Sequence, residues 1–196
     1  MEIGRTSCSK KKAVEGEFLL LYSDEASISV FPVISRTYAP IGKTPVITVS
    51  TEINARLYMA SAVSPQGDLL YMVRNKPFDS KAIIEYLEYL RAELKKKLLI
   101  IWDGASIHDS EEIRIWLALQ KPDEFFLAKQ PHYSPELNAD EQVWHQLKGV
   151  KLKNRCNQNV KELQPRIVKA MEELKENKDL IKAFFKHPEL AYNITT

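Results

Sequence analysis

The sequence is poor in cysteine and contains no long hydrophobic run. Its two cysteines, Cys8 and Cys156, stand far apart and form no C-x-x-C spacing. This argues against a thiolate zinc site and a disulfide scaffold, and it suits a reducing cytoplasm. The longest apolar runs are too short to cross a bilayer, and no signal-like apolar core follows the polar start of the chain. We therefore expect a soluble, cytoplasmic protein.

The chain also lacks an excess of one charge. It has 28 basic and 26 acidic residues and a formal net charge of +2, so its overall field is weak. Net charge therefore neither supports nor excludes a nucleic-acid partner, and local clusters must decide. With 196 residues, 44% of them hydrophobic, the chain can bury the core of one domain. We expect a flexible leader at residues 1–16 and one domain at residues 17–196.

The first half of the chain predicts β-strands. Runs rich in apolar or β-branched residues occupy positions 17–24, 46–51, 55–63 and 69–73, and residues 28–33 resemble an edge strand. Segments rich in proline and glycine separate several of these runs. This order predicts an antiparallel meander.

The second half alternates helices with short apolar strands. Asp79 can cap a helix with one apolar face, and Asp109 forms a capping-box pattern with Glu112 before another helix. Between them, residues 98–102 are typical of a central parallel strand. Residues 125–128 predict one more short strand.

Two helical regions follow the last strand. Asn138 opens the first of them, and helical sequence then continues to about residue 186. Pro165 indicates that the final helix either starts just before this residue or bends there. Taken together, the two halves predict an α/β fold in which helices flank a mixed sheet.

Three acidic residues stand at positions suited to metal binding. The run LLLYSD ends at Asp24 and the run LLIIWD ends at Asp103, while Glu141 lies in the first turn of the helix expected after Asn138. Carboxylates are the hard oxygen ligands that Mg²⁺ prefers, and two such ions about 3.5–4 Å apart can flank the reacting oxygens of a phosphodiester. The pattern indicates a metal-dependent enzyme that acts on DNA.

Each of these carboxylates also has an ordinary structural interpretation. Asp24 can end a strand by accepting hydrogen bonds from turn amides, and Asp103 before Gly104 is a common strand-to-loop pair. Glu141 would be the third helical residue after Asn138, where a glutamate can reach back to the cap. The spacing of these acidic residues in the sequence leaves both interpretations open for each of them. The occurrence of all three together favours a metal site.

Four segments carry recognisable motifs. They are YSDE (residues 22–25), RTYAPIG (36–42), WDGASIH (102–108) and QPHYSPELNADEQVW (130–144), the last followed by Leu147 and Lys148. Together they resemble the catalytic (DDE) domain of mariner-like bacterial insertion-sequence transposases, which belong to the RNase H-like superfamily. The likeness spans about residues 19–155, and its last segment is highly specific.

The resemblance implies a fold and a site. The fold would be RNase H-like, with a five-stranded mixed sheet made of an antiparallel meander and two parallel strands. Asp24 and Asp103 would lie on adjacent central strands and would complete a metal-binding catalytic triad with Glu141. The 37 residues between Asp103 and Glu141 are close to the gap that is usual in this group.

The resemblance also implies a reaction. With two Mg²⁺ or Mn²⁺ ions, the domain would nick DNA hydrolytically at transposon ends. The freed 3′-hydroxyl would then attack a phosphodiester of the target DNA, joining the two DNAs. Its partners would be double-stranded DNA and a second copy of itself, and on DNA it would be associated with the bacterial nucleoid. The alternatives are another RNase H-like nuclease, or a catalytically inactive DNA-binding module derived from a transposase.

The chain departs from the family pattern at several positions. Gly104 replaces the usual asparagine, Ala139 and Asp140 replace a Pro-Ile pair, and Tyr38 stands where tryptophan is common. We expect Asp140 to face solvent as a partner of the helix dipole. In members of this group a helix-turn-helix DNA-binding region normally precedes the catalytic domain, and we expect residues 1–196 to hold the catalytic domain without it.

Aromatic and histidine side chains form a second set of candidates. His108 is either a loop histidine bonded to backbone or a contact to a metal-bound water or the scissile phosphate. His132 and Tyr133 either line a DNA channel or pack within a turn. We expect Trp144 to pack against the sheet, and Trp102 and Trp116 to lie in the core.

A basic cluster follows the proposed glutamate. Its members are Lys148, Lys151, Lys153 and Arg155. Such a cluster can neutralise several phosphates, which would make DNA binding strongly dependent on salt. It can equally be a solvated helix end, and the sequence leaves the two interpretations even.

Overall fold

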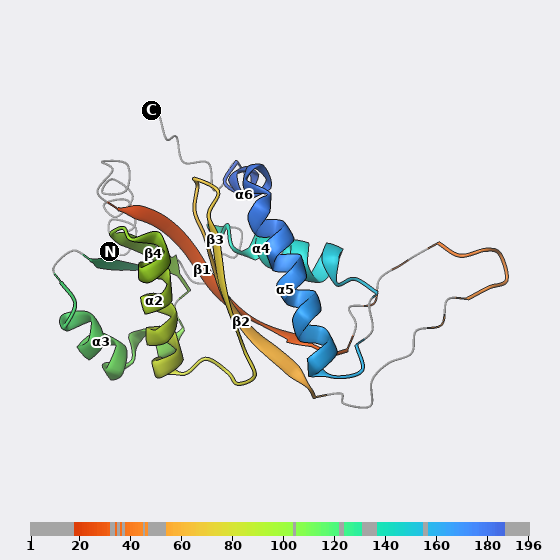
Figure 1. The fold of residues 1–196 in the computed structure, drawn as a ribbon, viewed down its shortest axis with the longest axis horizontal. Helices are drawn as coiled ribbons and strands as arrows, with labels where there is room; N and C mark the ends of the chain where they lie inside the picture. Colours follow the sequence, from red (N-terminus) through yellow and green to blue (C-terminus); the bar gives the residue numbers. More distant parts are fainter. Residues whose placement is uncertain are drawn as a thin grey trace.

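The centre of the fold is a five-stranded mixed sheet (Figure 1). The computed structural model describes residues 18–31, 34, 36, 38–44, 46, 54–103, 105–121, 124–130, 137–154 and 157–186. The strands are β1 (Leu19–Ser29), β2 (Arg56–Val63), β3 (Leu69–Arg74), β4 (Leu98–Trp102) and β5 (Phe125–Lys129). They lie in the order β3-β2-β1-β4-β5; β1 to β3 form an antiparallel meander, and β1, β4 and β5 run parallel. This confirms the predicted sheet.

Helices cover both faces of the sheet (Figure 1). One face packs against α2 (Ser80–Leu94), with α3 (Glu111–Ala118) beyond it, and the short 3₁₀ helix η1 (Ser106–Asp109) lies between β4 and α3. The other face packs against α4 (Glu141–Trp144), the π-helical segment η3 (His145–Lys151), α5 (Val160–Glu176) and α6 (Lys178–Phe184). The expected arrangement of helices around a mixed sheet is therefore confirmed.

Alternation along the strands sends side chains into two separate hydrophobic cores. In β1, Leu20 and Tyr22 join the core under α5 and α6, whereas Leu19 and Leu21 join the core under α2. Strand β4 is buried at all five positions, as expected of a central parallel strand with both faces covered. The sheet is thus fixed from both sides around β1 and β4.

Strand β1 is longer than the sequence predicts. Its pairing with β4 runs from Leu19 to Tyr22, but its antiparallel pairing with β2 continues to Ser29. The expected separate strand at residues 28–33 therefore begins as part of β1. For the same reason the prediction that Asp24 ends a strand is wrong, because β2 keeps the chain extended beyond it.

The helix starts agree with the sequence prediction for α2 and differ from it for α3. Asp79 caps α2 as predicted, and its carboxylate accepts a hydrogen bond from the backbone N–H of Ala82 at 2.8 Å. For α3 the predicted cap is wrong: Ser110 takes that place, while Asp109 pairs with Arg114. Helix α5 begins five residues before Pro165 and includes it.

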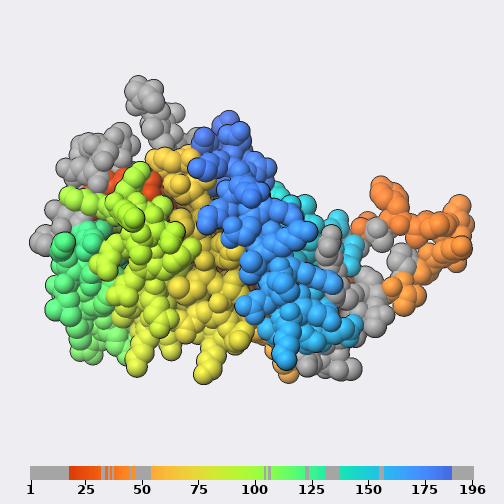
Figure 2. Space-filling model, viewed as in Figure 1, coloured from red at the N-terminus to blue at the C-terminus, as the bar shows by residue number. Residues whose placement is uncertain are grey.

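Residues 38–44, which lie in the connection between β1 and β2, are placed away from the sheet (Figure 2). Drawn orange in Figure 2, they project from the body of the molecule, and Tyr38 and Ile41 are fully exposed. The expected leader at residues 1–16, and nearly all of the expected strand at 46–51, lie outside the described residues. Within the described ranges, no helix is both long and apolar enough to span a membrane.

Candidate active site

Asp24 and Asp103 lie level with each other on neighbouring parallel strands. Tyr22 of β1 pairs with Ile101 of β4, and each aspartate follows two residues later. Side-chain alternation directs Asp24 to the face of Tyr22, which is the face covered by α4 and α5. Asp103 comes directly after β4, and its side chain is 54% exposed. Asp24 thus lies within β1, whereas Asp103 lies just beyond the end of its parallel neighbour β4 and not on the strand itself.

Glu141 is the first residue of α4 and lies close enough to Asp24 for its charge to act on that carboxyl group. The side chain of Asn138 accepts a hydrogen bond from the N–H of Asp140 at 3.0 Å, and its carbonyl accepts one from the N–H of Glu141 at 3.2 Å. Asn138 thus holds the turn before α4, and the helix begins later than predicted. Among the described residues, none hydrogen-bonds the Glu141 carboxylate, so the capping-box alternative finds no support there.

Trp144 connects α4 directly to Asp24. Its indole Nε1 donates a hydrogen bond to Oδ2 of Asp24 at 3.0 Å, and its side chain is buried in the core under α5. The predicted packing of Trp144 against the sheet is confirmed. Its bond to the aspartate was not predicted, because spacing along a helix does not show which strand atom an indole N–H will reach.

The pKa of the Asp24 carboxyl group is raised from 3.8 to about 7. Burial is the largest cause, and the negative charges of Glu141 and then Glu25 add to it. The hydrogen bonds from Trp144 and from the backbone N–H of Glu25 oppose the shift without cancelling it. Burial and the neighbouring negative charges therefore disfavour the charged form of Asp24.

Asp140 is buried, and the expectation that it faces solvent is wrong. It is 0% exposed, and its Oδ2 accepts a hydrogen bond from the Ser61 hydroxyl at 2.6 Å. Its Oδ1 is also buried and has no hydrogen-bond partner among the described residues. Burial, together with the charges of Asp24 and Glu141, raises the pKa of Asp140 well above its usual value. Helical spacing cannot show this, because the buried face of α4 is set by its contact with β2.

His108 lies beside Asp103 rather than at the surface. Its ring stacks on Trp102 with 4.1 Å between ring centroids, and its side chain is 0% exposed. Nδ1 lies 3.1 Å from Oδ1 of Asp103, and Nε2 lies 3.0 Å from Oε1 of Glu25. One ligand atom from each of these three residues falls within 4.8 Å of the others. The burial argues against direct contact between His108 and DNA. Glu25 was missed as a site residue, although it directly follows Asp24.

A family model described as "DDE superfamily endonuclease" matches residues 19–164, which include Asp24, Asp103 and Glu141. The chain belongs to this family. No curated protein sequence matches it.

Solved structures show that this DDE domain has the fold of a transposase catalytic domain. The chain matches the Mos1 strand transfer complex with a TM-score of 0.60 at 14% identity, covering 96% of this chain and 59% of that one. It matches the Mos1 mariner paired-end complex with Mn at 0.58 and 13% identity, covering 95% and 60%. The catalytic domain of Mos1 mariner transposase alone gives 0.53 at 10% identity, covering 97% and 95%. The predicted RNase H-like fold is confirmed, and the chain spans about three fifths of the Mos1 chains in the complexes.

The candidate basic residues of the DDE domain differ in what their charged groups contact. Lys148 Nζ lies 5.8 Å from the centre of the Trp144 ring, close to the helix that carries Glu141. Lys151 forms an ion pair with Glu173 of α5 at 2.6 Å, and Lys153 is exposed. The remaining candidates, His132, Tyr133 and Arg155, lie outside the described residues.

The acidic centre of the DDE domain has the donor chemistry of a divalent-cation site. The charges of Glu25 and Glu141 act on both Asp24 and Asp140, and Oδ1 of Asp140 is buried without a hydrogen-bond partner among the described residues. Carboxylate oxygens are the ligands that Mg²⁺ and Mn²⁺ accept, and a nearby cation would offset the burial and the like charges that raise the pKa of Asp24. The residues therefore fit such an ion.

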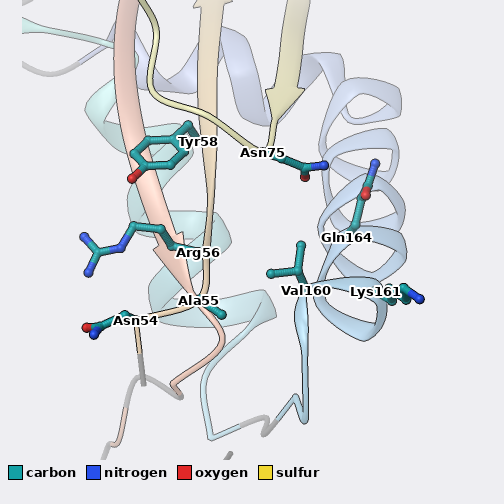
Figure 3. Close-up of a pocket in the computed structure, with 8 residues that line it drawn as sticks. All are labelled: Asn54, Ala55, Arg56, Tyr58, Asn75, Val160, Lys161 and Gln164. Atoms are coloured by element: carbon teal, nitrogen blue, oxygen red, sulfur yellow. The ribbon is translucent and has the colours of Figure 1, made fainter. Parts of the chain in front are cut away.

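A pocket of about 520 Å³ lies away from this centre, between the start of β2, the end of β3 and the first turn of α5 (Figure 3). Ala55 and Val160 face each other across it, and Arg56 and Lys161 contribute positive charge. None of the residues drawn is acidic. The pocket is thus chemically unlike the acidic centre of the DDE domain.

Proposed function

We propose that this domain catalyses DNA transposition, and that Asp24, Asp103 and Glu141 hold the Mg²⁺ or Mn²⁺ ions on which the reaction depends. The observation that supports this most directly is the meeting of two segments distant in the sequence. Asp24 of β1 lies level with Asp103, and α4 brings Glu141 to Asp24. Asp24 and Glu141 offer the hard oxygen ligands that Mg²⁺ and Mn²⁺ prefer, and Asp103 lies at the same level of the sheet, where its carboxylate is near Glu25 and His108.

The proposed reaction cleaves a DNA phosphodiester at a transposon end and then joins the freed 3′-hydroxyl to target DNA. When bound, the divalent ions would neutralise charge on the phosphate and activate the attacking oxygen. Asp24 and Glu141 would bind the ions in their ionised forms, and His108 would hold the carboxylate of Asp103 in place. The Mos1 strand transfer and paired-end complexes, to which the chain is similar, support DNA as the substrate.

A homodimer on DNA is part of the same proposal, since two transposon ends have to be joined together. Lys148 would contact phosphates near the cleaved bond, because it follows Glu141 on the same helical segment. Lys153 and, outside the described residues, Arg155, His132 and Tyr133 are further candidates for DNA contacts.

The test uses Asp103→Asn, which keeps the shape of the side chain and removes its charge. Mn²⁺-dependent nicking of supercoiled plasmid should be lost, and calorimetry should show weaker Mn²⁺ binding. Asp109→Asn is the matched control, since it removes an exposed carboxylate six positions away that pairs only with Arg114 and Lys129 among the described residues. Unchanged nicking by Asp103→Asn would contradict the proposal. Cleavage confined to the RNA strand of a hybrid would favour a ribonuclease.

A further inference from the structure

Helix α4 is fastened to the sheet on both sides of Glu141. Before Glu141, the Ser61 hydroxyl of β2 donates a hydrogen bond to Oδ2 of Asp140 at 2.6 Å. After it, Nε1 of Trp144 donates to Oδ2 of Asp24 at 3.0 Å. The two contacts therefore enclose the first turn of the helix that carries the proposed metal ligand.

The two hydrogen bonds connect α4 to residues of neighbouring strands that lie opposite each other. Ser61 is the residue of β2 that pairs with Asp24 of β1 in the antiparallel register. The chain of contacts thus runs from Asp24 across the ladder to Ser61, through Asp140 and Trp144, and back to Asp24. Glu141 lies inside this closed circuit, which fixes its distance from Asp24.

The helix needs such contacts, because it is short. As a regular α-helix, α4 has only four residues before the backbone changes to the wider π-helical turn of η3. A segment of this length has little stability of its own and takes its position from tertiary contacts. Asp140 has no side-chain role in capping the helix, so its carboxylate is available to Ser61.

We propose that Ser61 and Asp140 form a positioning pair that holds Glu141 against Asp24, with Trp144 as the second anchor. The inference rests on the proposed function of Glu141 as a metal ligand and adds the residues that place it. The hydrogen bond accomplishes this, and the charge of Asp140 is not required. Ser61 and Asp140 are both 0% exposed, so neither can contact DNA or solvent directly.

The test measures Mn²⁺ affinity by calorimetry in the full chain. Ser61→Ala removes the donor and should weaken Mn²⁺ binding about tenfold or more, the usual effect of losing a partner that orients a ligand. Asp140→Ala removes the acceptor and should do the same. Asp140→Asn keeps an acceptor oxygen for Ser61 and should retain most of the affinity.

Ser64→Ala is the matched control. Ser64 is equally buried and donates a hydrogen bond of the same length, 2.6 Å, to Asp68, but it lies in the turn after β2 with no link to α4. Its loss costs the fold a similar bond, and Mn²⁺ affinity should stay unchanged. Ser64 Oγ also accepts a hydrogen bond from the N–H of Asp68 at 3.0 Å, so Ser64→Ala removes at least as much bonding as Ser61→Ala. An equal loss of affinity in the two variants would therefore show a general loss of structure and overturn the proposal.

A double-mutant cycle separates positioning from stability. In a Glu141→Gln background, Ser61→Ala should have little further effect on Mn²⁺ affinity, because the pair acts only through Glu141. Full additivity of the two substitutions would overturn the proposal. Amide hydrogen exchange gives a readout that needs no metal, and Ser61→Ala should speed exchange at Val143 and Trp144 whereas Ser64→Ala should not.

The two proposals fail in different ways. Absence of carboxylate-dependent Mn²⁺ binding in the unsubstituted protein would contradict the proposed function. The exchange measurement would then still decide on the positioning pair, and unchanged exchange in Ser61→Ala would overturn it. Normal metal binding that is insensitive to Ser61→Ala would overturn the positioning pair and leave the proposed function standing.

Discussion

Nε2 of His108 lies 3.0 Å from Oε1 of Glu25, joining η1 to β1 across 83 residues of sequence. The other ring nitrogen, Nδ1, lies 3.1 Å from the carboxylate of Asp103, and Trp102 supports the ring from one side. Both nitrogens face acceptor oxygens, an arrangement that favours the doubly protonated imidazolium. A single buried side chain therefore links the strand of Asp24 to the loop of Asp103.

Glu25→Gln should lower the pKa of His108. Burial alone would lower this pKa, but the hydrogen bond and charge of Glu25, followed by those of Asp103, raise it above 6.5. Removing the charge of Glu25 takes away the strongest support of the imidazolium, so the ring should lose its proton at lower pH. Nuclear magnetic resonance titration of the His108 ring in metal-free buffer measures this shift against the unsubstituted protein. An unchanged His108 titration would show that Asp103 alone supports the charge.

The metal-free protein should lose stability as pH rises from 5 to 8. The pKa of Asp24 is raised from 3.8 to about 7 in the folded state, so folding favours the protonated form. That contribution is complete below the unfolded pKa and disappears as pH rises through 7. The loss attributable to Asp24 should be about 2–3 kcal/mol between pH 5 and 8.

Urea unfolding with a chelator at several pH values measures this loss. Asp24→Asn cannot titrate, so its stability should depend less on pH by the amount stated for Asp24. Addition of Mg²⁺ at pH 8 should restore stability to the unsubstituted protein and much less to the variant. Parallel pH profiles of the two proteins would show that Asp24 titrates normally.

Asp140→Asn should stabilise the metal-free protein at pH 8. The Asp140 carboxyl group is fully buried, has one oxygen without a hydrogen-bond partner among the described residues and lies near the charges of Asp24 and Glu141. An amide keeps the bond from Ser61 and cannot ionise, so it avoids the cost of either charging or protonating this buried group at pH 8. This should add about 1–3 kcal/mol to the free energy of unfolding. Asp179→Asn, at an exposed position of α6, serves as the control and should change stability little. A less stable Asp140→Asn would indicate that the buried charge has a partner.

Lys148 should contribute more to DNA binding than Lys151. Lys148 lies over the Trp144 ring beside the acidic centre, while the charge of Lys151 is matched by Glu173 at 2.6 Å. Lys148→Gln should weaken binding to all duplex sequences and reduce the salt dependence by about one counterion. Lys151→Gln should have a smaller effect, and Lys175→Gln, at an exposed position of α5, should have none. Fluorescence anisotropy at several salt concentrations distinguishes the three, and equal effects would contradict the assignment.

The sheet and most of its helices were predictable because each depends on a local pattern. Residues 98–102 are an uninterrupted apolar run, and in the structure they form a strand buried on both faces. Asp103 could be placed at the end of that strand for the same reason. The position of Asp24 inside a strand could not be predicted in this way. The strand continues through Asp24 because it pairs with β2, and the pattern of apolar residues does not show such pairing.

The buried contacts of the candidate active site were the least predictable part of the structure. The position of Asp140 at a helix start predicts a solvent-facing side chain. In the structure it accepts a hydrogen bond from Ser61, 79 positions earlier in the chain. The π-helical turn at His145–Lys151 likewise has no signature in composition or spacing. The burial of Asp140 and the π-helical turn both depend on how α4 packs against β2, which is a tertiary contact. The proposed triad was predicted from specific sequence motifs, and such motifs indicate chemistry more strongly than conformation.

The order of strands has a consequence for how the chain acquires its structure. β1 is made first, but the parallel neighbour that covers one of its edges, beginning with Leu98, is made only after β2, β3 and α2. Until then, a growing polypeptide presents an apolar strand with an unsatisfied backbone edge, which is a template for aggregation. Closure of the β1–β4 pair should therefore limit the refolding rate, and fragments ending before Leu98 should precipitate.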